Sequence, residues 1–508
     1  MKTNMLTRTL SLALSILLCV TPLISCNSNK GNTDKGGAEI HLSDKYVITR
    51  PENASEMVKS CAKELRTAYQ EQGLELEIKD DWAKSESDIP ELEILLGDTS
   101  RPESARLKES FGENTAWKIG VDGKKLVIAA DSDRALANAV SELVTKLIKK
   151  GEGINIMSTF TLSADKSGEN TPIEFLWKDG EESVIKSGSW GPRVYTLSNG
   201  TVIAGYETSS GIRTSTSTDG AKSFKKEASA SFYPSLACAN VNLFEHEGKV
   251  YLAYRATGAV ENGFYTSLQL SVSENGGKSW EKHSTIAEYT QADGAFRGVW
   301  EPYLGLLNGK LTCFYANDSS SVTPMQNIEY LVWNGTSWGE RTVVSEGTAH
   351  NSRDGMPVWT RLSSGEYVCV IESSSARDSG HPFVIQILYS RDGKKWSIPV
   401  TVYTPTTNGS KAGAPGIVEL PSGQLVISFQ TDEDATQKGD GTSVMKTITS
   451  DGTEIKKLKA KNFTKSDNVF GTPDGEGSVW TGIWYCDGWL YAAAGTSKGS
   501  SLKKIELY

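Results

Sequence analysis

The sequence predicts an all-β, six-bladed β-propeller over residues 173–508, preceded by a small α+β domain over residues 40–165. Two offset repeats indicate the propeller: a strand–turn–strand segment that occurs six times, and a short turn motif that lies between successive segments. Both repeats recur about every 50 to 60 residues, which is the length of one four-stranded blade. A helical period of apolar residues, confined to the first third of the chain, indicates the α+β domain.

The first 25 residues predict a secretion signal peptide. Lys2 and Arg8 precede the apolar run LSLALSILLCV, which is shorter than the roughly 20 residues that span a membrane. The run leads to Leu-Ile-Ser-Cys, which resembles the bacterial lipobox and implies a lipid on Cys26. Residues 26–39 are polar and glycine-rich, and they predict a flexible tether. We therefore expect a lipoprotein of the bacterial cell envelope, held at the periplasmic or outer side of the outer membrane; the alternative is an ordinary signal peptide that contains a cysteine.

Residues 40–165 alternate strand-like and helical patterns. The first predicted helix has an apolar residue at every fourth position: Met57, Cys61, Leu65 and Tyr69. Strand patterns follow, and then a second amphipathic helix that Ser132 caps and Gly151 ends. This arrangement resembles the accessory domain that precedes the catalytic domain of several secreted glycosidases, such as hexosaminidases and α-glucuronidases.

From residue 173 onward, six segments combine two strand patterns with a glycine turn between them. The segments are VYTLSNGTVIAGYE, NLFEHEGKVYLAYR, LGLLNGKLTCFYAN, TRLSSGEYVCVIES, VELPSGQLVISFQT and IWYCDGWLYAAAG. Their turn residues are Gly200, Gly248, Gly309, Gly365, Gly423 and Gly488. Six copies predict six blades, each with its first strand along a central channel.

The second repeat gives the same blade spacing independently. STSTDGAKSF, SVSENGGKSW and YSRDGKKWS resemble the Asp-box of sialidase-type propellers, and LVWNGTSW and TITSDGTE are fainter copies. The turn residues of the five copies, spaced 56 to 59 apart, are Asp219, Asn275, Asn334, Asp392 and Asp451. Because their side chains are expected to bond nearby backbone N–H groups, we assign these turns a structural role. The sixth blade has no copy, and residues 172–187 are expected to supply its outer strand and close the ring.

The hairpins predict which residues share one mouth of the channel. Since the two strands of a hairpin are antiparallel, a residue about eight before the turn glycine should lie beside one about seven after it. Glu301 is eight residues before Gly309, and Glu372 is seven after Gly365, in the neighbouring third and fourth blades. Two carboxylates facing one pocket suit glycoside hydrolysis. The alternative for each glutamate is a solvated rim residue or an ion-pair partner of an arginine.

Other residues at the same mouth are candidate substrate contacts. They are Arg193, Asn240, Arg255, Trp300, Asp354 and Gln430.

Two segments around the glutamates carry a more specific resemblance. VWEPYL and RDGMPVWTRLSSGEYVCVIES, together with the Asp-boxes, are similar to the exo-α-1,5-L-arabinanases of glycoside hydrolase family 93, which are secreted six-bladed enzymes. That family carries a Trp-Glu-Pro segment and, about 70 residues later, a Gly-Met-Pro strand followed by a second glutamate; Glu301 and Glu372 are 71 apart. The resemblance covers residues 173–508. It implies that the two glutamates are the nucleophile and the acid/base of a retaining exo-hydrolase acting on α-L-arabinan or a related plant or host glycan.

Two other functions remain open at the level of sequence. An exo-α-sialidase needs three arginines, which Arg193, Arg255 and Arg353 could supply, but the last blade lacks the expected Tyr-Ser motif. A non-catalytic glycan-binding propeller would instead stack sugars on rim aromatic residues. The candidates for this role are Trp190, Trp300 and Trp359.

Composition excludes several other classes of protein. The net charge is −9 with acidic and basic residues interspersed, so nucleic acid is not an expected partner. The chain has only five histidines, and its cysteines lack metal-binding spacing, so neither a metal nor another cofactor is expected. The expected partners are an oligosaccharide or polysaccharide and, through the lipid alone, a membrane.

Overall fold

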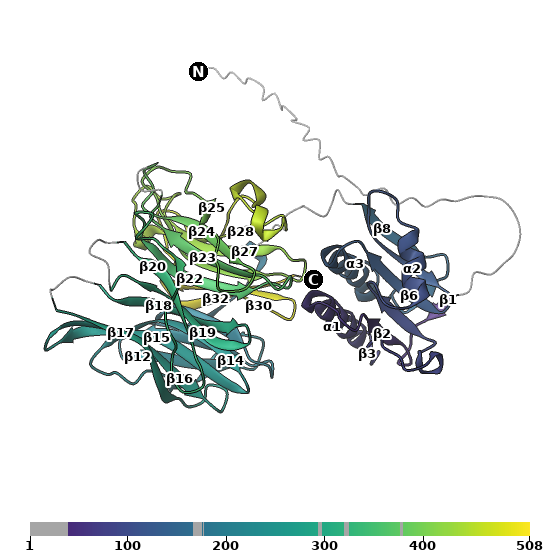
Figure 1. The fold of residues 1–508 in the computed structure, drawn as a ribbon, viewed down its shortest axis with the longest axis horizontal. Helices are drawn as coiled ribbons and strands as arrows, with labels where there is room; N and C mark the ends of the chain where they lie inside the picture. The colour runs from purple at the N-terminus through teal and green to yellow at the C-terminus, as the bar shows by residue number, and fades with distance from the viewer. Residues whose placement is uncertain are drawn as a thin grey trace, which may run out of the picture. The chain divides into compact units, whose positions relative to one another are not determined.

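The computed structural model describes residues 39–165, 175, 177–292, 297–319, 325–375 and 379–507 (Figure 1). The predicted signal peptide, the lipidation residue Cys26 and nearly all of the predicted tether lie outside these residues. Within the described part of the chain, no helix combines the length and the apolar character needed to cross a membrane.

Residues 39–165 form a mixed sheet with three helices. The strands, in sheet order, are β3 (Glu77–Asp80), β2 (Val47–Arg50), β4 (Glu93–Leu96), β6 (Lys125–Ala130), β5 (Thr115–Asp122) and β8 (Thr161–Asp165). The strands from β3 to β6 run parallel, and β5 and β8 are antiparallel to their neighbours. A separate strand pair joins β1 (Glu39–His41) to β7 (Asn155–Met157). The helices are α1 (Glu56–Glu71), α2 (Pro102–Glu109) and α3 (Asp133–Lys146).

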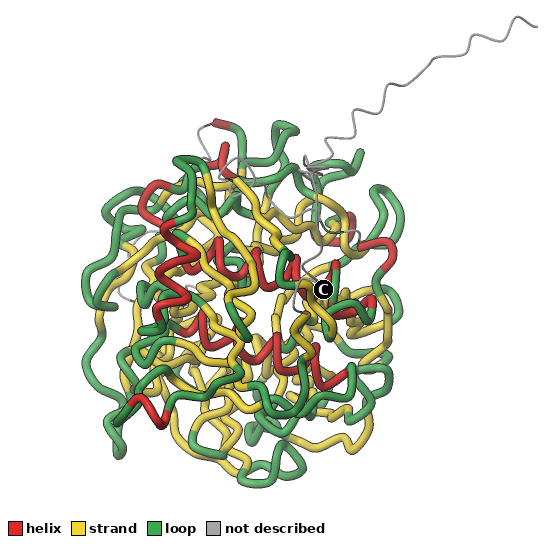
Figure 2. The backbone as a smooth tube through the Cα atoms, turned by 90° about the vertical axis from the view of Figure 1, so that its right-hand side faces the viewer, coloured by secondary structure: helices red, strands yellow, loops and turns green. Residues whose placement is uncertain are grey.

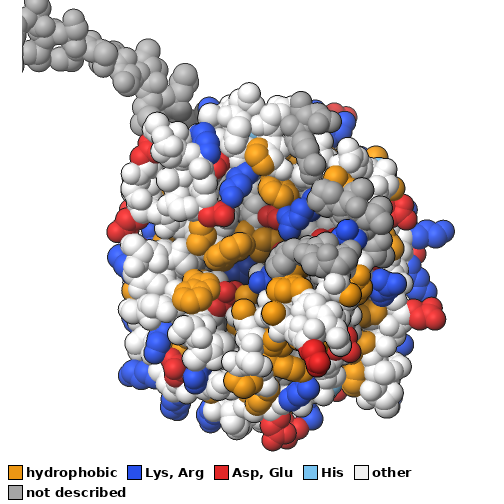
Figure 3. All heavy atoms as spheres, turned by 90° about the vertical axis from the view of Figure 1, so that its left-hand side faces the viewer, with side chains coloured by type: hydrophobic (Ala, Val, Ile, Leu, Met, Phe, Trp, Pro, Cys, Tyr) orange, Lys and Arg blue, Asp and Glu red, His pale blue; other side chains and the backbone are white. Residues whose placement is uncertain are grey.

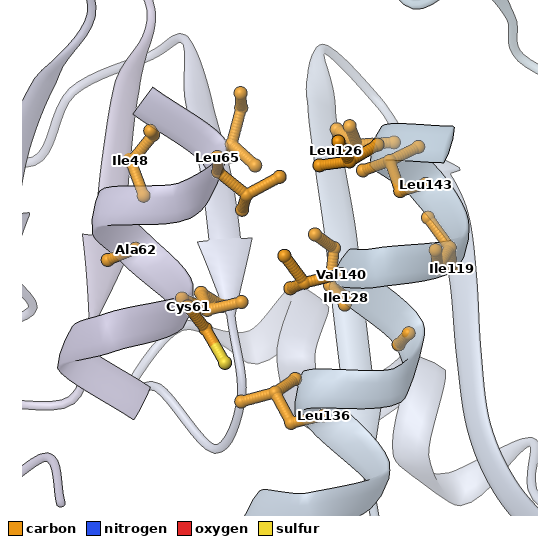
Figure 4. Close-up of a cluster of buried hydrophobic side chains, with 14 of the residues drawn as sticks. Ile48, Cys61, Ala62, Leu65, Ile119, Leu126, Ile128, Leu136, Val140 and Leu143 are labelled. Atoms are coloured by element: carbon orange, nitrogen blue, oxygen red, sulfur yellow. The ribbon is translucent and has the colours of Figure 1, made fainter. Parts of the chain in front are cut away.

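The apolar faces of α1 and α3 build the core of this region. Cys61 and Leu65 of α1 and Val140 of α3 are fully buried among strand residues such as Ile128 (Figure 4). Ser132 caps α3 as predicted, since its side chain accepts the backbone N–H of Ala135 at 3.1 Å.

Six four-stranded antiparallel sheets follow, so the predicted six-bladed propeller is confirmed. Beyond residue 165, the described chain contains no helix longer than a single 3₁₀ turn. Figure 2 distinguishes the helices, strands and loops of the backbone by colour. The blades are β10–β13 (Trp190–Thr196, Val202–Thr208, Gly211–Ser217, Lys225–Ser229), β14–β17 (Ala237–His246, Lys249–Val260, Gly263–Ser273, Glu281–Gln291), β18–β21 (Val299–Leu307, Lys310–Asn317, Asn327–Val332, Thr342–Ser345), β22–β25 (Asp354–Arg361, Tyr367–Ser373, Val384–Ser390, Val400–Tyr403), β26–β29 (Ala412–Glu419, Leu425–Thr431, Val444–Thr449, Asp467–Phe470) and β30–β32 (Val479–Cys486, Trp489–Thr496, Gly499–Glu506) with β9 (Glu181–Lys186).

The ring is closed by a strand from before the first blade. β9 (Glu181–Lys186) pairs with β32 of the sixth blade, with Val184 opposite Ser501. The prediction that residues 172–187 supply the sixth outer strand is therefore confirmed for residues 181–186. The first strands of successive blades contact one another all the way around, including β30 with β10. Closure in this way leaves no blade without a neighbour.

The turns behave as their residues require. All six predicted hairpin glycines have a positive φ, between 75° and 91°, which residues other than glycine rarely adopt. In the first Asp-box turn, Asp219 accepts the Ser217 hydroxyl at 2.7 Å and the Ser223 N–H at 3.0 Å. Such turns join the third and fourth strands of their blades, away from the channel.

The middle of the channel is nearly filled by side chains of the first strands. A cavity of about 30 Å³ lies there, bordered by Arg193, Asn242, Tyr303 and Val358 among others. A space of this size holds about one water molecule. The mouth that carries the candidate site therefore has a floor. A separate pocket of about 660 Å³ lies toward the hairpin turns, where Asn308 and Gly309 help to line it.

Candidate active site

Every blade carries the same β-bulge on its first strand, near the end away from the hairpin turn. In each case two residues of the first strand oppose one residue of the second. We call the first of the two the bulge residue, and all six have a positive φ of 48° to 58°: Gly191, Asn240, Glu301, Met356, Ala414 and Trp480. Proline follows the bulge residue in four blades, where a missing N–H is tolerated. Glu301 therefore stands between a tryptophan and a proline because it is a bulge residue.

A second set of residues faces the bulges. The ring position of a blade is the second-strand residue paired with the residue just before the bulge. In blade order, the ring positions are Glu207, Arg255, Ala316, Glu372, Gln430 and Gly495.

Side chains at three ring positions bind the next blade. Glu207 Oε1 accepts the N–H of Asn240 at 2.8 Å, and Glu372 Oε2 accepts the N–H of Ala414 at 2.9 Å. Gln430 Oε1 accepts the N–H of Trp480 in the same way, at 2.6 Å. These bonds use the backbone donors that the bulges turn toward the neighbouring blade.

The third blade departs from this pattern. Its ring position is Ala316, whose methyl group cannot accept a hydrogen bond. The N–H of Met356 in the fourth blade instead donates to Glu301 Oε2 at 3.0 Å. The small side chain at position 316 thus leaves room for the carboxylate of Glu301.

This departure brings the two predicted glutamates to one place. Glu301 binds the N–H of Met356, while Glu372 pairs opposite the preceding residue, Gly355. A methyl group added to Gly355 would lie 3.1 Å from Glu372 Oε1, so that carboxylate lies directly over the glycine. The carboxylates of Glu301 and Glu372 therefore both lie against the Gly355–Met356 segment.

The two carboxyl groups have different surroundings. Glu372 is only 8% exposed, and burial, reinforced by the charge of Glu301, raises its pKa. Arg353, whose Nη1 lies 3.4 Å from Glu372 Oε1, opposes this increase, as do the N–H of Ala414 and the charge of Lys411. Glu301 is less buried and has Arg255 as a charged neighbour. The raised pKa suits Glu372 to carrying a proton.

The three arginines that a sialidase would need all lie beside carboxylates. Arg193 and Arg255 are charged neighbours of Glu207, and Arg255 also neighbours Glu301. Burial raises the pKa of Glu207, and its bond to Asn240 and the two arginines counteract that effect. Since Arg353 contacts Glu372, each guanidinium of this group has a counter-charge within the chain.

Two further predicted substrate contacts, Asp354 and Gln430, form hydrogen bonds within the protein. The carboxylate of Asp354 accepts hydroxyl groups from three buried serines, Ser345, Ser352 and Ser373. The side-chain oxygen of Gln430 accepts the backbone N–H of Trp480, and its Nε2 donates to Asp440 at 3.1 Å. Neither side chain has the free polar groups expected of a substrate contact, so their predicted binding roles stay predictions.

The three tryptophans predicted to stack on sugars differ in their exposure to solvent. Trp300 is buried and donates its Nε1–H to Asp318 at 2.9 Å, with the Arg255 guanidinium 5.3 Å from the ring centre. Trp359 is 3% exposed and packs against the third blade, where its ring stacks on Phe314 with 4.5 Å between the ring centres. Trp190 is 42% exposed. Only the last of these three has a surface that a sugar could cover.

Buried polar atoms without a partner gather near this rim. Among the described residues, they include Asn240 Oδ1, Arg255 Nε and both amide atoms of Gln326. Gln326 Oε1 would lie 3.6 Å from a methyl group on Gly355, on the side occupied by Glu372. Native proteins leave few such groups unpaired, and those that remain are often functional. In Figure 3, one face of the molecule is hollowed at its centre, and hydrophobic, acidic and basic side chains surround the hollow.

Sequence reasoning missed three of these residues as site candidates. Glu207 stands seven residues after its turn glycine, as Glu372 does, so the same offset could have identified it. Trp480 stands eight residues before Gly488, as Glu301 does before Gly309, so that offset could have identified it too. Gln326 precedes β20 and is brought to the site by a bridge to Arg353 in the next blade.

Across the described ranges, no group of three or more His, Cys, Asp or Glu side chains is placed to hold a metal ion.

Comparison with known proteins reveals similar structures but no similar sequence family. No protein-family profile matches the chain, and no curated protein matches it. An α-L-arabinofuranosidase of glycoside hydrolase family 93 from Fusarium graminearum, in complex with arabinobiose, is 16% identical, with a TM-score of 0.50 over 65% of this chain and 98% of that one. An α-L-arabinanase from Penicillium chrysogenum with arabinobiose is 18% identical, with a TM-score of 0.49 over 66% and 99%. The NanB sialidase of Streptococcus pneumoniae is 11% identical, with a TM-score of 0.45 over 69% and 75%.

These structural neighbours are glycoside hydrolases. At such identities, the likeness to the Fusarium enzyme shows the propeller fold and nothing finer. The chain is therefore a six-bladed β-propeller preceded by a small α+β region.

Proposed function

We propose that this protein is a secreted, exo-acting glycoside hydrolase that removes short arabinose units from α-L-arabinan or a related neutral glycan. The observation that carries the proposal is the placement of the Glu301 and Glu372 carboxylates against the same two residues, Gly355 and Met356. Paired carboxylates of this kind are the machinery of most glycosidases. In keeping with the lipobox-like sequence, the enzyme is held in the cell envelope by a lipid on Cys26.

The surroundings of the two carboxyl groups suggest their roles. Glu372, whose pKa is raised by burial, protonates the leaving glycosidic oxygen. Glu301, beside Arg255, attacks the anomeric carbon and forms a covalent glycosyl–enzyme ester. Glu372 then takes a proton from water, the water oxygen displaces the Glu301 carboxylate, and the sugar leaves with its configuration retained.

The charges favour a neutral sugar over a sialic acid. An acidic sugar is bound through arginines whose charge is available to its carboxylate. Here Arg193 and Arg255 share Glu207, and Arg353 contacts Glu372. A sugar carboxylate would have to compete with these internal partners.

The test uses purified protein with linear arabinan, arabino-oligosaccharides, aryl arabinosides and an aryl sialoside. We expect short arabinose products from chain ends, with retained anomeric configuration by NMR. Release of sialic acid would replace this proposal with the sialidase alternative. Binding of arabino-oligosaccharides without any release of sugar would support a glycan-binding propeller instead.

Lipid anchoring has its own test. A Cys26→Ser variant should lose the lipid mass and leave the membrane fraction, while its activity stays unchanged. Membrane retention of that variant would contradict anchoring through Cys26.

A further inference from the structure

We propose that a second sugar-binding subsite lies where the sixth and first blades meet, formed by Trp190, Trp480 and Gly495. It binds the sugar unit next to the one that reacts at Glu301 and Glu372. This inference rests on the proposed hydrolase function and adds a subsite to it. We call the ring position of Gly495, which carries no side chain, the gap.

The first observation is an empty ring position. Four of the six blades carry a polar or charged side chain there, and in the third blade Glu301 takes the room above Ala316. The sixth blade has Gly495, which places nothing in that room. A methyl group on Gly495 would lie 3.5 Å from Trp190 Cβ and 3.6 Å from the backbone nitrogen of Gly191, so it would be in ordinary contact with the first blade.

The second observation is the exposure of two tryptophans at this gap. Among the described residues only three tryptophans are exposed, and they are Trp82 (64%), Trp190 (42%) and Trp480 (37%). The Cβ atom of Trp190 lies beside Gly495, while the Trp190 side chain is hydrogen-bonded to Glu207. Trp480 follows Val479, the strand partner of Gly495. Exposed aromatic residues gathered at one place commonly mark a binding surface.

The backbone of Trp480 is held in an uncommon conformation. Its φ is 57°, which is rare for a bulky residue. Its N–H donates to Gln430 Oε1 at 2.6 Å, and its carbonyl accepts Arg193 Nη1 at 2.8 Å. Two polar side chains from two other blades therefore hold the backbone that presents this indole. A conformation that the surroundings impose in this way is typical of functional sites.

The chemistry of the gap suits a neutral sugar ring. Sugar rings have apolar C–H faces that pack on indole rings, and hydroxyl edges that bond to polar groups. In a six-bladed ring, the sixth and first blades stand across the channel from the third and fourth blades, which carry Glu301 and Glu372. A chain whose terminal unit reaches the carboxylates can therefore lay its next unit on the tryptophans.

The first test is Trp480→Ala, assayed on arabino-oligosaccharides. Alanine fits this backbone, because Ala414 occupies the equivalent position in the fifth blade with a φ of 48°. We expect KM for oligosaccharides to rise about tenfold, the size of one good aromatic contact, while kcat changes little. Trp190→Ala should act in the same direction, and Trp82→Ala is the matched control that leaves KM unchanged.

The second test places a side chain in the gap by substituting Gly495. Gly495→Gln gives the sixth blade the side chain that the fifth blade has at Gln430, and Gly495→Ala gives it that of the third blade. The glutamine variant should raise KM strongly and the alanine variant weakly, with unfolding temperatures close to wild type. The dissociation constant for an arabino-oligosaccharide, measured in the Glu372→Gln background, should follow the same order.

The possible outcomes distinguish failure of the subsite proposal from failure of the hydrolase proposal. If the wild-type protein releases arabinose units but all four Trp190, Trp480 and Gly495 variants keep its KM, the subsite is overturned and the hydrolase stands. If the wild type releases no sugar yet binds oligosaccharides more tightly than these variants, the subsite stands and the hydrolase falls. If it neither cleaves nor binds them, both fall.

Discussion

The backbone N–H of Met356 donates a 3.0 Å hydrogen bond to the carboxylate of Glu301 in the preceding blade. In the first, fourth and fifth blades the equivalent acceptor is the side chain at the ring position, which is Ala316 in the third blade. The position of Glu301 therefore depends on the small size of a neighbour that takes no part in the chemistry.

A long side chain at position 316, like those at the ring positions of other blades, should displace Glu301. We expect Ala316→Glu to place a second carboxylate against the Met356 N–H and to reduce activity about 10²-fold or more, since a displacement of about 1 Å can have that effect. Kinetics on an arabino-oligosaccharide check this, with Ala316→Ser as a control of small size. Full activity in Ala316→Glu would show that the bond to Met356 does not position Glu301.

Replacing either glutamate by glutamine should abolish turnover and preserve the fold. Glu372→Gln and Glu301→Gln keep the volume of the side chain but remove the acid or the nucleophile, so rates should fall about 10² to 10⁴-fold or more. Unfolding temperatures should stay within a few degrees of wild type.

Azide assigns the two roles. It should restore cleavage of an activated aryl glycoside by Glu301→Gln, because a small anion can attack in place of the lost nucleophile. For Glu372→Gln it should help only the second step. The reverse pattern would exchange the roles proposed for the two residues.

The alkaline limb of the pH–rate profile should report Glu372. The general acid must be protonated, so kcat/KM should fall as the pH rises through the pKa of Glu372, which burial raises. Because Arg353 lowers that pKa, Arg353→Gln should shift the limb to higher pH. Arg391→Gln, on an exposed arginine, is the control. A limb that stays in place or moves to lower pH would argue against Glu372 as the acid.

The raised pKa of Glu372 also makes a prediction about stability. A carboxyl group whose pKa is higher in the folded state favours folding below its unfolded pKa, and this contribution is lost as the pH rises through the folded value. Glutamine does not titrate, so the unfolding temperature of Glu372→Gln minus that of wild type should increase from acidic to neutral pH. Calorimetry over a pH series measures this difference, and a constant or decreasing difference would contradict it.

Glu207 should act on stability. Glu207→Ala leaves the N–H of Asn240 without its acceptor and removes the shared counter-charge of Arg193 and Arg255, a change expected to cost about 3 to 5 kcal/mol. Glu207→Gln keeps an acceptor and should cost less. Urea unfolding measures both, with the exposed Glu281→Ala as control. A Glu207→Ala protein as stable as wild type would mean that the two arginines do not depend on this carboxylate.

Local patterns in the sequence were enough to predict the frame of the molecule. The turn glycines at positions such as 309 and 365 need a positive φ, and apolar residues that recur along α1 must face a core, so these elements are readable from short windows. The regular spacing of the hairpins predicted six blades, and the unpaired strand pattern before the first blade predicted β9 (Glu181–Lys186) as the closing strand. The offsets of Glu301 and Glu372 from their turns likewise predicted that both lie at one mouth.

What each side chain does at that mouth depends largely on contacts between blades, which join residues 33 to 55 positions apart in the chain. Asp354 and Gln430 occupy the expected rim, yet neighbouring serines and the N–H of Trp480 use their polar groups. Glu301 reaches its position only because Ala316 is small and Met356 offers a donor from the next blade. A hairpin repeat determines which residues reach the rim, because strand direction and turn position are local properties. The tertiary structure decides which of them remain free to act, because hydrogen bonds and burial between blades are set only when the ring closes.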